Sequence, residues 1–425
     1  PAEGNYILEC YSGPRRLEAG KPVYFIFRLL ITPFKPFAAH KQWRTRFMHQ
    51  YAPPVVAKAE GATVLNIHHA KPINPFINYP FLRPAELRSF VSEAHRLGLK
   101  VCVYYTVREL SNHAPELFAL RSLRSESGSE IFSDGPGGGH SWLQEHFGDS
   151  YIPAWHVFEY GCVAVITSGT SRWHNFYVEG IHWLAKNMEL DGVYIDDLAF
   201  DRRIMQRVRR VLDAERKEAI IDMHSANQYN PRDGYANSIN LYMEHLPYLD
   251  RLWFGEYFRY DQGPDYWMTE VAGLPFGVGG EMLQDGGNLW RGLLYGITAR
   301  YPHTKGDPRP LWRLWEDFGI EDSDFLGYWA PSCPVRSNSR HILASCYKRK
   351  ETALIVLASW EETEFAVQLS IDWQALSWQP ERYELFQPFV AGVQEECCYQ
   401  LADKIPVQAA EGVILILRVR KSIHQ

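Results

Sequence analysis

The feature that most constrains the fold is a regular alternation of short apolar runs and helix-like segments between about residue 22 and residue 330. Eight runs have the length and the β-branched or aromatic content of buried strands. They lie at 23–32, 62–69, 100–107, 192–196, 219–227, 250–258, 272–283 and 292–302, and the last of them also fits a helix. This alternation predicts a parallel sheet with crossover helices, and eight repeats are enough to close it into a (β/α)8 barrel of the α/β class. A doubly wound open sheet is less favoured, because no glycine-rich phosphate-binding turn follows the first run.

The segments between the runs carry ordinary helix signals. Pro84 opens one helical stretch and Gly98 closes it, and Asp201 is suited to cap the helix that follows at 202–217. Residues 121–170 interrupt the alternation of strands and helices with a polar, glycine-rich stretch. A long segment of this kind in a compact domain predicts a functional loop or a lid.

The pattern changes at about residue 333. Five short strand-like runs follow one another without a long helix, at 341–348, 352–359, 364–371, 382–387 and 412–419. They predict a small antiparallel β-sandwich. The expected domains are therefore a barrel over 22–332 and a β-sandwich over 333–425. Residues 1–21 read as a strand-like lead-in, which we expect to be the end of a further N-terminal β-domain.

Composition excludes several classes of function. The formal net charge is -6, with 44 Lys and Arg against 50 Asp and Glu, so the chain has no basic footprint for nucleic acid. No apolar stretch approaches the ~18 residues of a membrane-spanning helix. The seven Cys form no C-x-x-C motif, and Cys102 and Cys346 read as buried thiols. We therefore expect no nucleic-acid partner, no membrane span, no bound metal and no cofactor, and the sequence does not predict the oligomeric state.

Two adjacent acids end the strand-like run "GVYID", and they are the first candidates for catalysis. Side chains alternate along a strand, so Val193 and Ile195 share one face, and Tyr194 and Asp196 share the other. Asp196 is then expected at the carboxyl end of the barrel, where barrel active sites form. Asp197 lies one step further and is expected to be a helper, or a cap for the helix that follows.

Glu256 is the second candidate acid. It follows the run "LWFG", and Gly255 allows a kink or a close approach of the backbone that would aim the carboxyl group into the cleft. Apolar neighbours are expected to favour its protonated form by desolvation, as a general acid requires. Two opposed carboxyl groups in an aromatic-rich cleft are what glycoside hydrolysis needs.

Further polar and aromatic residues cluster near the predicted strand ends. We interpret six of them as substrate-binding candidates: His68, Tyr105, Arg108, His224, Trp253 and Glu281. Lys35, Arg108 and Arg300 could bind an acidic group on the substrate, and they could equally form structural ion pairs.

Several blocks resemble a known family. "FRLLITPFKP", "GVYIDDLAFDR", "LWFGEYF" and "GLPFGVGGEMLQDGGNLWRG" are similar to bacterial glycoside hydrolase barrels of unassigned activity, and to the family 123 β-N-acetylgalactosaminidases. "DGVYIDD" more distantly resembles the α-galactosidase and α-glucosidase clans. The resemblance implies a glycosidase that acts on an oligosaccharide or polysaccharide, and a secreted or periplasmic location.

The resemblance leaves two mechanisms open. In the clans, the Asp that ends strand four is the nucleophile and an acid after strand six is the proton donor, which implies Asp196 and Glu256 with retention of configuration. Family 123 uses an Asp-Glu pair at strand four and lets the acetamido group of the substrate attack, which implies Asp196 and Asp197. The first mechanism is preferred here, because it gives Glu256 a role and because strand parity turns Asp197 away from the cleft. Asp197 is also one methylene shorter than the Glu of the family.

Two other kinds of function compete with the glycosidase. A metal-dependent hydrolase could draw ligands from His68, His69, His113 and His224, but adjacent histidines on a strand point to opposite faces and chelate one ion poorly. A carbohydrate-binding protein without catalysis could use the aromatic cleft and the β-domain. Loss of turnover with retained sugar binding, when Asp196 or Glu256 is replaced, separates the enzyme from the binder.

Overall fold

The structure is a computed structural model. It describes residues 7–11, 13–27, 29–106, 109–111, 113–116, 143–144, 162–165, 172–196, 198, 200–227, 239–282, 287–303 and 306–420. The chain divides into two units, Pro1–Ile31 and Thr32–Gln425.

The described residues of the first unit contain a turn at residues 19–20 and neither helix nor strand. The apolar run at 23–32 is therefore not the first barrel strand, and this sequence-based expectation is wrong. A β-branched and aromatic run becomes a strand only where a neighbouring strand accepts its hydrogen bonds. The sheet takes its first strand instead from Phe47–Met48, a pair too short to stand out in the sequence.

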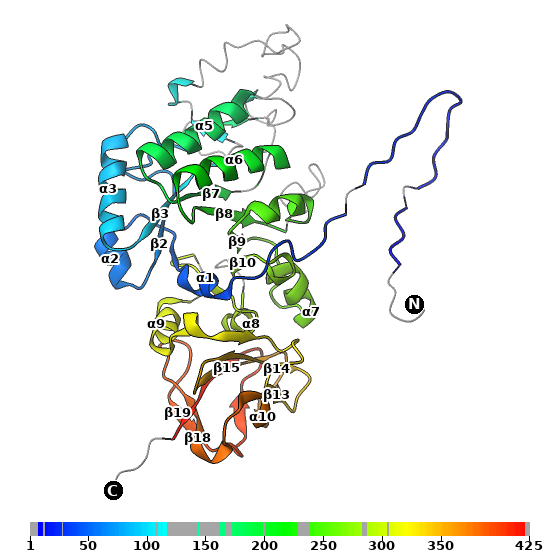
Figure 1. The fold of residues 1–425 in the computed structure, drawn as a ribbon, viewed down its shortest axis with the longest axis vertical. Helices are drawn as coiled ribbons and strands as arrows, with labels where there is room; N and C mark the ends of the chain where they lie inside the picture. Colours follow the sequence, from blue (N-terminus) through cyan, green and yellow to red (C-terminus); the bar gives the residue numbers. More distant parts are fainter. Residues whose placement is uncertain are drawn as a thin grey trace. The chain divides into compact units, whose positions relative to one another are not determined.

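Eight parallel strands form the sheet of the second unit (Figure 1). In spatial order they are β1 (Phe47–Met48), β2 (Val64–Ile67), β3 (Lys100–Tyr104), β7 (Gly192–Asp196), β8 (Ile220–Ser225), β9 (Arg251–Phe254), β10 (Gly279–Met282) and β11 (Thr298–Ala299). A parallel bridge between Met48 and Tyr301 joins the last strand to the first. The predicted (β/α)8 barrel is confirmed, with seven of its eight strands inside the predicted runs.

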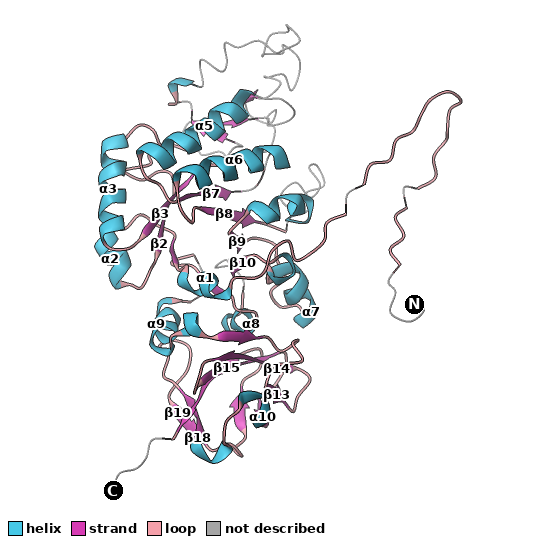
Figure 2. Ribbon diagram, viewed as in Figure 1, coloured by secondary structure: helices cyan, strands magenta, loops and turns pink. Residues whose placement is uncertain are grey.

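Helix α1 precedes β1, and the other helices follow the strands and lie outside the sheet (Figure 2). They are α1 (Ala39–Arg44), α2 (Pro54–Ala59), α3 (Pro84–Arg96), α5 (Arg172–Asn187), α6 (Arg202–Glu215), the 3-10 helix η3 (Ile239–Tyr248), α7 (Pro264–Tyr266) with its π-helical continuation η4 (Trp267–Val271), the 3-10 turn η5 (Leu274–Phe276), α8 (Leu289–Leu294), α9 (Arg309–Phe318) and η6 (Ile320–Asp322). The side chain of Asp201 accepts hydrogen bonds from the backbone of Arg203 and Ile204 at 2.8 and 3.2 Å, and caps α6 as predicted.

The excursion between β3 and α5 holds a small antiparallel sheet. Its strands β4 (Glu109–Ser111), β6 (Cys162–Val165) and β5 (Leu143–Gln144) lie in that spatial order. Most of the expected loop at 121–170 lies outside the described residues.

The C-terminal part is all β apart from the short α10 (Trp373–Leu376) and the 3-10 turn η7 (Pro380–Arg382). One antiparallel sheet has the order β12 (Asp324–Leu326), β14 (Ile342–Lys348), β15 (Ala353–Ser359), β21 (Gly412–Val419), β18 (Tyr383–Gln387) and β19 (Cys397–Tyr399). Two ribbons pair β13 (Val335–Ser337) with β17 (Leu369–Ile371), and β16 (Phe365–Val367) with β20 (Ile405–Val407).

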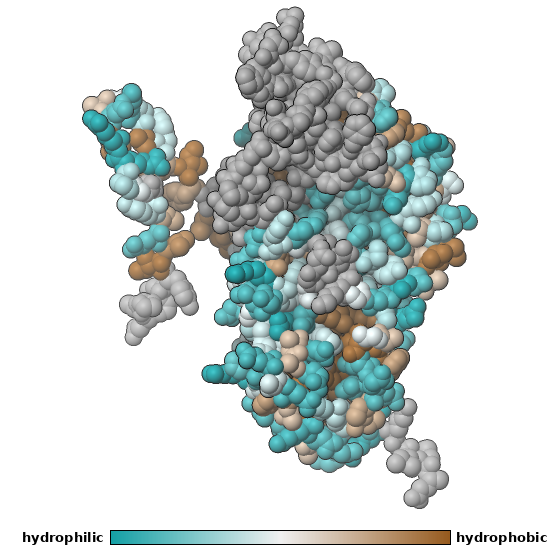
Figure 3. All heavy atoms as spheres, turned by 180° about the vertical axis from the view of Figure 1, so that it is seen from behind, coloured by the Kyte–Doolittle hydropathy of each residue, from teal (hydrophilic) through white to brown (hydrophobic). Residues whose placement is uncertain are grey.

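Packing explains why β15 reads as continuously apolar. Its residues Ala353, Ile355 and Leu357 join the core that the sheet shares with the ribbons. Its alternate residues Leu354 and Val356 join a second core with α8 and α9 of the barrel. A strand covered on both faces loses the alternation that a half-exposed strand shows. The face shown in Figure 3 is mostly hydrophilic among the described residues.

Candidate active site

The mouth of the barrel is built from side chains that point inward at the carboxyl ends of the strands. Val193 and Ile195 belong to the large core between sheet and helices, whereas Tyr194 packs with Tyr104 and Trp253 inside the barrel. Asp196 is therefore at the inner face of β7, as strand parity predicted. Its side chain is 24% exposed, so it remains open to a substrate.

His224 and Tyr104 are two of the described residues that contact the Asp196 carboxylate. Its Oδ1 lies 2.9 Å from Nδ1 of His224, on the adjacent strand β8. The hydroxyl of Tyr104 donates to Oδ2 at 3.3 Å, and the hydroxyl of Thr106 donates to the backbone carbonyl at 3.0 Å. These contacts fix both the strand end and the carboxylate that it carries.

Glu256 meets the other side of the same imidazole ring. Its Oε2 lies 3.0 Å from Nε2 of His224, in an ion pair whose direction departs from that of a good hydrogen bond. Its backbone carbonyl accepts a hydrogen bond from the backbone of Asn227 at 2.9 Å, and its side chain is 46% exposed. Asp196, His224 and Glu256 are named the mouth cluster below.

Gly255 makes this contact possible. A Cβ atom at this position would lie 2.0 Å from Nε2 of His224 and 2.9 Å from the carbonyl oxygen of Ser225. Every other residue type would push the imidazole ring away from Glu256. The close approach that the sequence suggested at Gly255 therefore accommodates a histidine.

The mouth cluster carries alternating charges. Burial opposes the charged form of His224, but the hydrogen bond with Asp196 and the contacts and charges of both carboxylates outweigh it and raise its pKa to about 10. Burial likewise favours protonated Glu256, but its ion pair with His224 lowers its pKa below the usual value. The expectation that desolvation raises the pKa of Glu256 is therefore corrected, because the contact with His224 outweighs the effect of burial.

Three more histidines surround this imidazolium and stay neutral. Burial lowers the pKa of His68 to about 4, and it lowers the pKa of His49 and of His303. The charges of His224 and Arg300 add to the effect on His49 and His303, because like charges repel. Among these four histidines, His224 is therefore the charged one.

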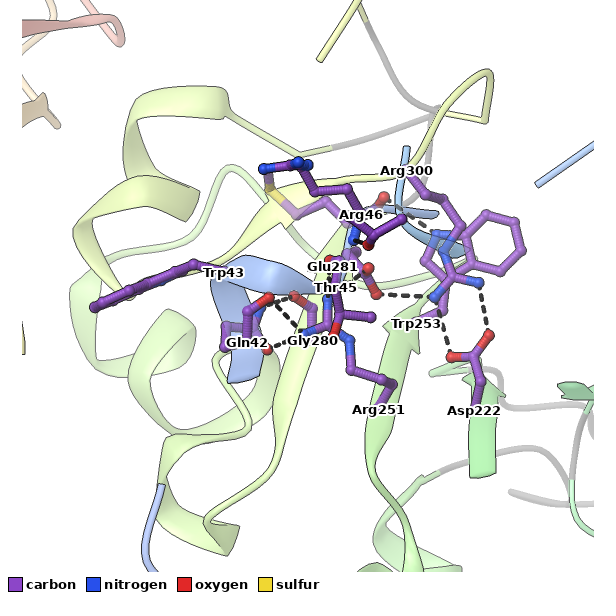
Figure 4. Close-up of polar contacts among 12 residues, drawn as sticks. Gln42, Trp43, Thr45, Arg46, Asp222, Arg251, Trp253, Gly280, Glu281 and Arg300 are labelled. Carbon is purple, nitrogen blue, oxygen red and sulfur yellow. Dashed lines mark hydrogen bonds and ion pairs between the residues drawn. The ribbon is translucent and has the colours of Figure 1, made fainter. Parts of the chain in front are cut away.

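A second set of charges lies deeper in the barrel (Figure 4). Arg300 binds Asp222 through two nitrogens at 2.8 and 3.0 Å, and it donates to Glu281 at 2.8 Å. Arg251 contacts the other oxygen of Glu281 at 2.5 Å. These four residues, named the inner cluster below, are buried, with the carboxylates 0 and 1% exposed. The expectation that Glu281 binds substrate is corrected, because arginines occupy both of its oxygens.

Tyr105 and Trp253 also differ from the sequence-based interpretation. Tyr105 faces the helices, where its ring stacks on Tyr177 at 4.9 Å and its hydroxyl points at Gly180 of α5. Tyr104, one residue earlier, is the tyrosine at the mouth. Trp253 is inside the barrel but buried, and its indole nitrogen donates to the carbonyl of Met282 at 3.2 Å. It forms a wall beneath His224, with ring centroids 4.9 Å apart.

Comparison with known families matches the chain over most of its length. Residues 38–302 match the TIM-barrel domain of glycoside hydrolase 123, and residues 307–418 match the C-terminal domain of the same family. The chain belongs to glycoside hydrolase family 123. It is a glycosidase. A search of curated protein sequences gives no match.

Solved structures share the fold of this glycosidase at low sequence identity. An alpha-amylase from Geobacillus thermoleovorans complexed with acarbose has a TM-score of 0.52 and 12% identity, over 91% of this chain and 100% of that one. An alpha-amylase from Lactobacillus plantarum has a TM-score of 0.53 and 12% identity, over 89% and 99%. At this identity the likeness concerns the barrel and its β-domain, and says nothing of the substrate.

Sequence reasoning missed Tyr104 and His49, which face the barrel interior. Tyr194 lies on the face of Asp196, as strand parity indicated, 3.0 Å from Nδ1 of His224. Parity did not single out Tyr104 over Tyr105, because both faces of β3 are apolar and no acid marks the inner one. The predicted candidates Asp197 and Arg108 lie outside the described residues.

A cavity of about 650 Å³ lies at the opposite end of the barrel, lined by the first residues of five strands, such as Val64, Lys100 and Arg251. Its charges are largely paired, since Lys41 and Lys100 share Glu218 at 3.7 and 3.6 Å. It is separate from the mouth cluster. Among the residues that the structure describes, no three His, Cys, Asp or Glu are grouped to hold a metal ion, and no helix is long and apolar enough to span a membrane.

Proposed function

We propose that the chain cleaves the glycosidic bonds of an oligosaccharide or polysaccharide with Asp196 and Glu256 as its carboxylate pair. Asp196 attacks the anomeric carbon, Glu256 exchanges a proton with the glycosidic oxygen, and the configuration is retained. One observation carries the proposal. Of the four described carboxylates that line the inside of strands β7 to β10, these two are open to substrate and bound to a titratable cation, whereas Asp222 and Glu281 are buried against arginine.

The spacing of the pair sets a requirement. Retaining enzymes hold their carboxyl groups about 5–5.5 Å apart, and inverting enzymes about 6.5–9.5 Å. Asp196 and Glu256 contact opposite nitrogens of one imidazole ring, so the width of the ring separates them in the free protein. Retention therefore requires Glu256 to move toward Asp196 when the substrate binds, and active-site contacts often tighten in this way.

A panel of natural glycans and aryl glycosides tests the proposal, with the anomer of the first-formed product followed by NMR. We expect turnover with a retained anomer, and loss of turnover but not of sugar binding in Asp196→Asn. An inverted anomer would make Asp196 the base that activates water. Absence of turnover on every glycoside would overturn the proposal.

Family membership favours a second route, in which Asp196 orients the acetamido group of the substrate and Asp197 is the acid. This route needs a 2-acetamido sugar, because the acetamido oxygen is the nucleophile. Turnover of a 2-hydroxy sugar at a comparable rate would exclude it. Conversely, a larger loss from Asp197→Asn than from Glu256→Gln, confined to 2-acetamido substrates, would establish it.

A further inference from the structure

Two buried donors at the amino end of the barrel lack a hydrogen-bond partner among the described residues. They are Nε1 of Trp315, on α9, and Nε of Arg251, at the start of β9, and the two residues are 1 and 3% exposed. Buried polar groups nearly always have a partner, so each of these requires an explanation. Both residues line the cavity of about 650 Å³ at this end of the barrel, which is named the amino-end cavity below.

The chemistry of the two groups restricts what can satisfy them. An indole nitrogen and a guanidinium nitrogen only donate hydrogen bonds, so their partner must be an acceptor. The other two nitrogens of Arg251 contact Gln42, Thr45 and Glu281, which holds the guanidinium group in place (Figure 4). Its Nε–H group is therefore fixed in position and free to make one more hydrogen bond.

The charge of the amino-end cavity favours an acidic partner. Six cationic side chains line it, against four acidic ones. Lys41 and Lys100 share the single carboxylate of Glu218, and the ammonium group of Lys35 donates to the backbone carbonyl of Leu249. Burial is the main cause that lowers the pKa of Lys35, so an anion beside it would stabilise its charged form.

The size of the amino-end cavity suits an organic molecule better than an inorganic ion. Ligand cavities in proteins usually measure about 300–1,000 Å³, and this one lies within that range. Its lining residues also come from separate elements, with Trp315 on α9, Arg251 on β9 and Lys35 ahead of α1. A molecule that contacts all three must span the distance between these elements.

We propose that the amino-end cavity is a second binding site, which takes a small organic anion of about the size of a monosaccharide through the N–H groups of Arg251 and Trp315 and the ammonium group of Lys35. The sequence suggested Lys35 as a ligand for an acidic group on the substrate, and the structure places it here instead of at the mouth. The proposal goes beyond the proposed function and does not depend on it, because the amino-end cavity is separate from the mouth cluster.

Isothermal titration calorimetry of the native protein tests the proposal with three probes. Glucose 6-phosphate and glucuronate carry a phosphate and a carboxylate on a sugar of the proposed size, and glucose is the uncharged control. We expect one equivalent of at least one charged probe to bind, with glucose at least about tenfold weaker. If neither charged probe binds, ordered water satisfies the two donors, and the proposal is overturned.

Trp315→Phe is the decisive variant, because phenylalanine keeps an aromatic ring in the core and lacks the N–H group. We expect it to weaken the charged probe about tenfold or more, since a hydrogen bond to a charged group contributes about that factor. Trp312→Phe is the matched control. Trp312 lies one turn earlier on α9, is equally buried and also has no partner for Nε1 among the described residues, but it does not line the amino-end cavity. Equal weakening by the two variants would assign the effect to the packing of α9 and overturn the proposal.

Two further variants keep the test decisive if Trp315→Phe does not fold. Lys35→Met should also weaken the charged probe about tenfold or more, and should leave kcat/KM on aryl glycosides unchanged, because Lys35 lies at the end of the barrel opposite the mouth. Asp196→Asn should bind the probe as tightly as the native protein does. Undiminished binding in Lys35→Met, or loss of binding in Asp196→Asn, would place the probe elsewhere and overturn the proposal, whether or not the protein turns over a glycoside.

Discussion

Two clusters inside one barrel follow the same plan of a cation between two carboxylates. In the inner cluster, Arg300 lies between Asp222 and Glu281. In the mouth cluster, His224 lies between Asp196 and Glu256. Asp222 and His224 are neighbours on the same face of β8, two residues apart, so one strand contributes to both clusters.

The difference between the two clusters is the cation and its access to water. Arginine keeps its charge at every ordinary pH, and its planar fork binds carboxylates through two nitrogens. It can hold the barrel together, but it cannot donate a proton. Histidine can lose its proton, and the carboxylates beside it are 24 and 46% exposed. The comparison teaches that the choice of cation, more than the presence of paired acids, separates a structural cluster from one suited to catalysis.

The largest expected effect is on activity in the mouth cluster. Glu256→Gln should lower kcat about 10²- to 10⁴-fold on sugars with poor leaving groups, because general acid catalysis contributes about that factor. Activated aryl glycosides should lose far less. Steady-state kinetics on both substrates measure the difference. Equal losses on the two would contradict Glu256 as the proton donor.

The matched change in the inner cluster should affect stability. Glu281→Gln removes one partner from a buried ion pair and leaves Arg251 with an unpaired charge, at a cost of about 3–5 kcal/mol in the free energy of unfolding. Urea unfolding at neutral pH measures it. A loss below about 1 kcal/mol would show that the inner cluster does not stabilise the folded protein.

The two clusters should also differ in how stability depends on pH. The folded-state pKa of His224, about 10, lies above the value of about 6.5 for an unfolded histidine, so its contribution is complete below about pH 6.5 and is lost as the pH rises through about 10. The free energy of unfolding should fall by up to about 1.4 kcal/mol per pH unit in this window.

Unfolding titrations of the native protein and of His224→Asn between pH 6 and pH 10.5 measure this contribution as a difference in slope. The inner cluster does not enter this difference, because its residues are the same in both proteins. Parallel curves for the two proteins would contradict the raised pKa of His224.

The smallest expected effect concerns backbone strain, which the mouth carries and the inner cluster does not. Tyr257 follows Glu256 with φ of 67°, in the left-handed region that disfavours a bulky side chain, whereas none of the four inner residues has a positive φ. Tyr257→Gly should stabilise the protein by about 1 kcal/mol. Glu189→Gly, at φ of 56° after α5, is the control with the same backbone change far from the mouth. Destabilisation by Tyr257→Gly alone would show that its side chain packs at the mouth.

Much of the fold followed from periodicity in the sequence. The runs at 62–69, 100–107 and 219–227 became β2, β3 and β8, and Asp201 capped α6. The strand predicted at 23–32 is not formed, because residues of high strand propensity become a strand only where a neighbouring strand pairs with them. Strand β1 was not predicted, because two residues are too few to show an alternating pattern.

The candidate site was predictable where a single strand decides it. Parity within "GVYID" was enough to put Asp196 at the inner face of β7. Parity did not distinguish Tyr104 from Tyr105, because both faces of a barrel strand are apolar. Nor did it distinguish Glu256 from Glu281, since each follows a glycine at a strand end.

The sequence by itself determined the alternating order of strands and helices, and with it the ends at which Asp196, His224 and Glu256 emerge, because side-chain alternation and helix periodicity are local. Only the tertiary structure decided which cation stands between which acids. Parallel pairing makes β7, β8 and β9 neighbours and places a titratable ring between the open carboxylates. Arg300, which follows β11, reaches across the closed barrel and places a permanent charge between the buried ones. That pairing depends on contacts between strands, so it cannot be predicted from the sequence of any single segment.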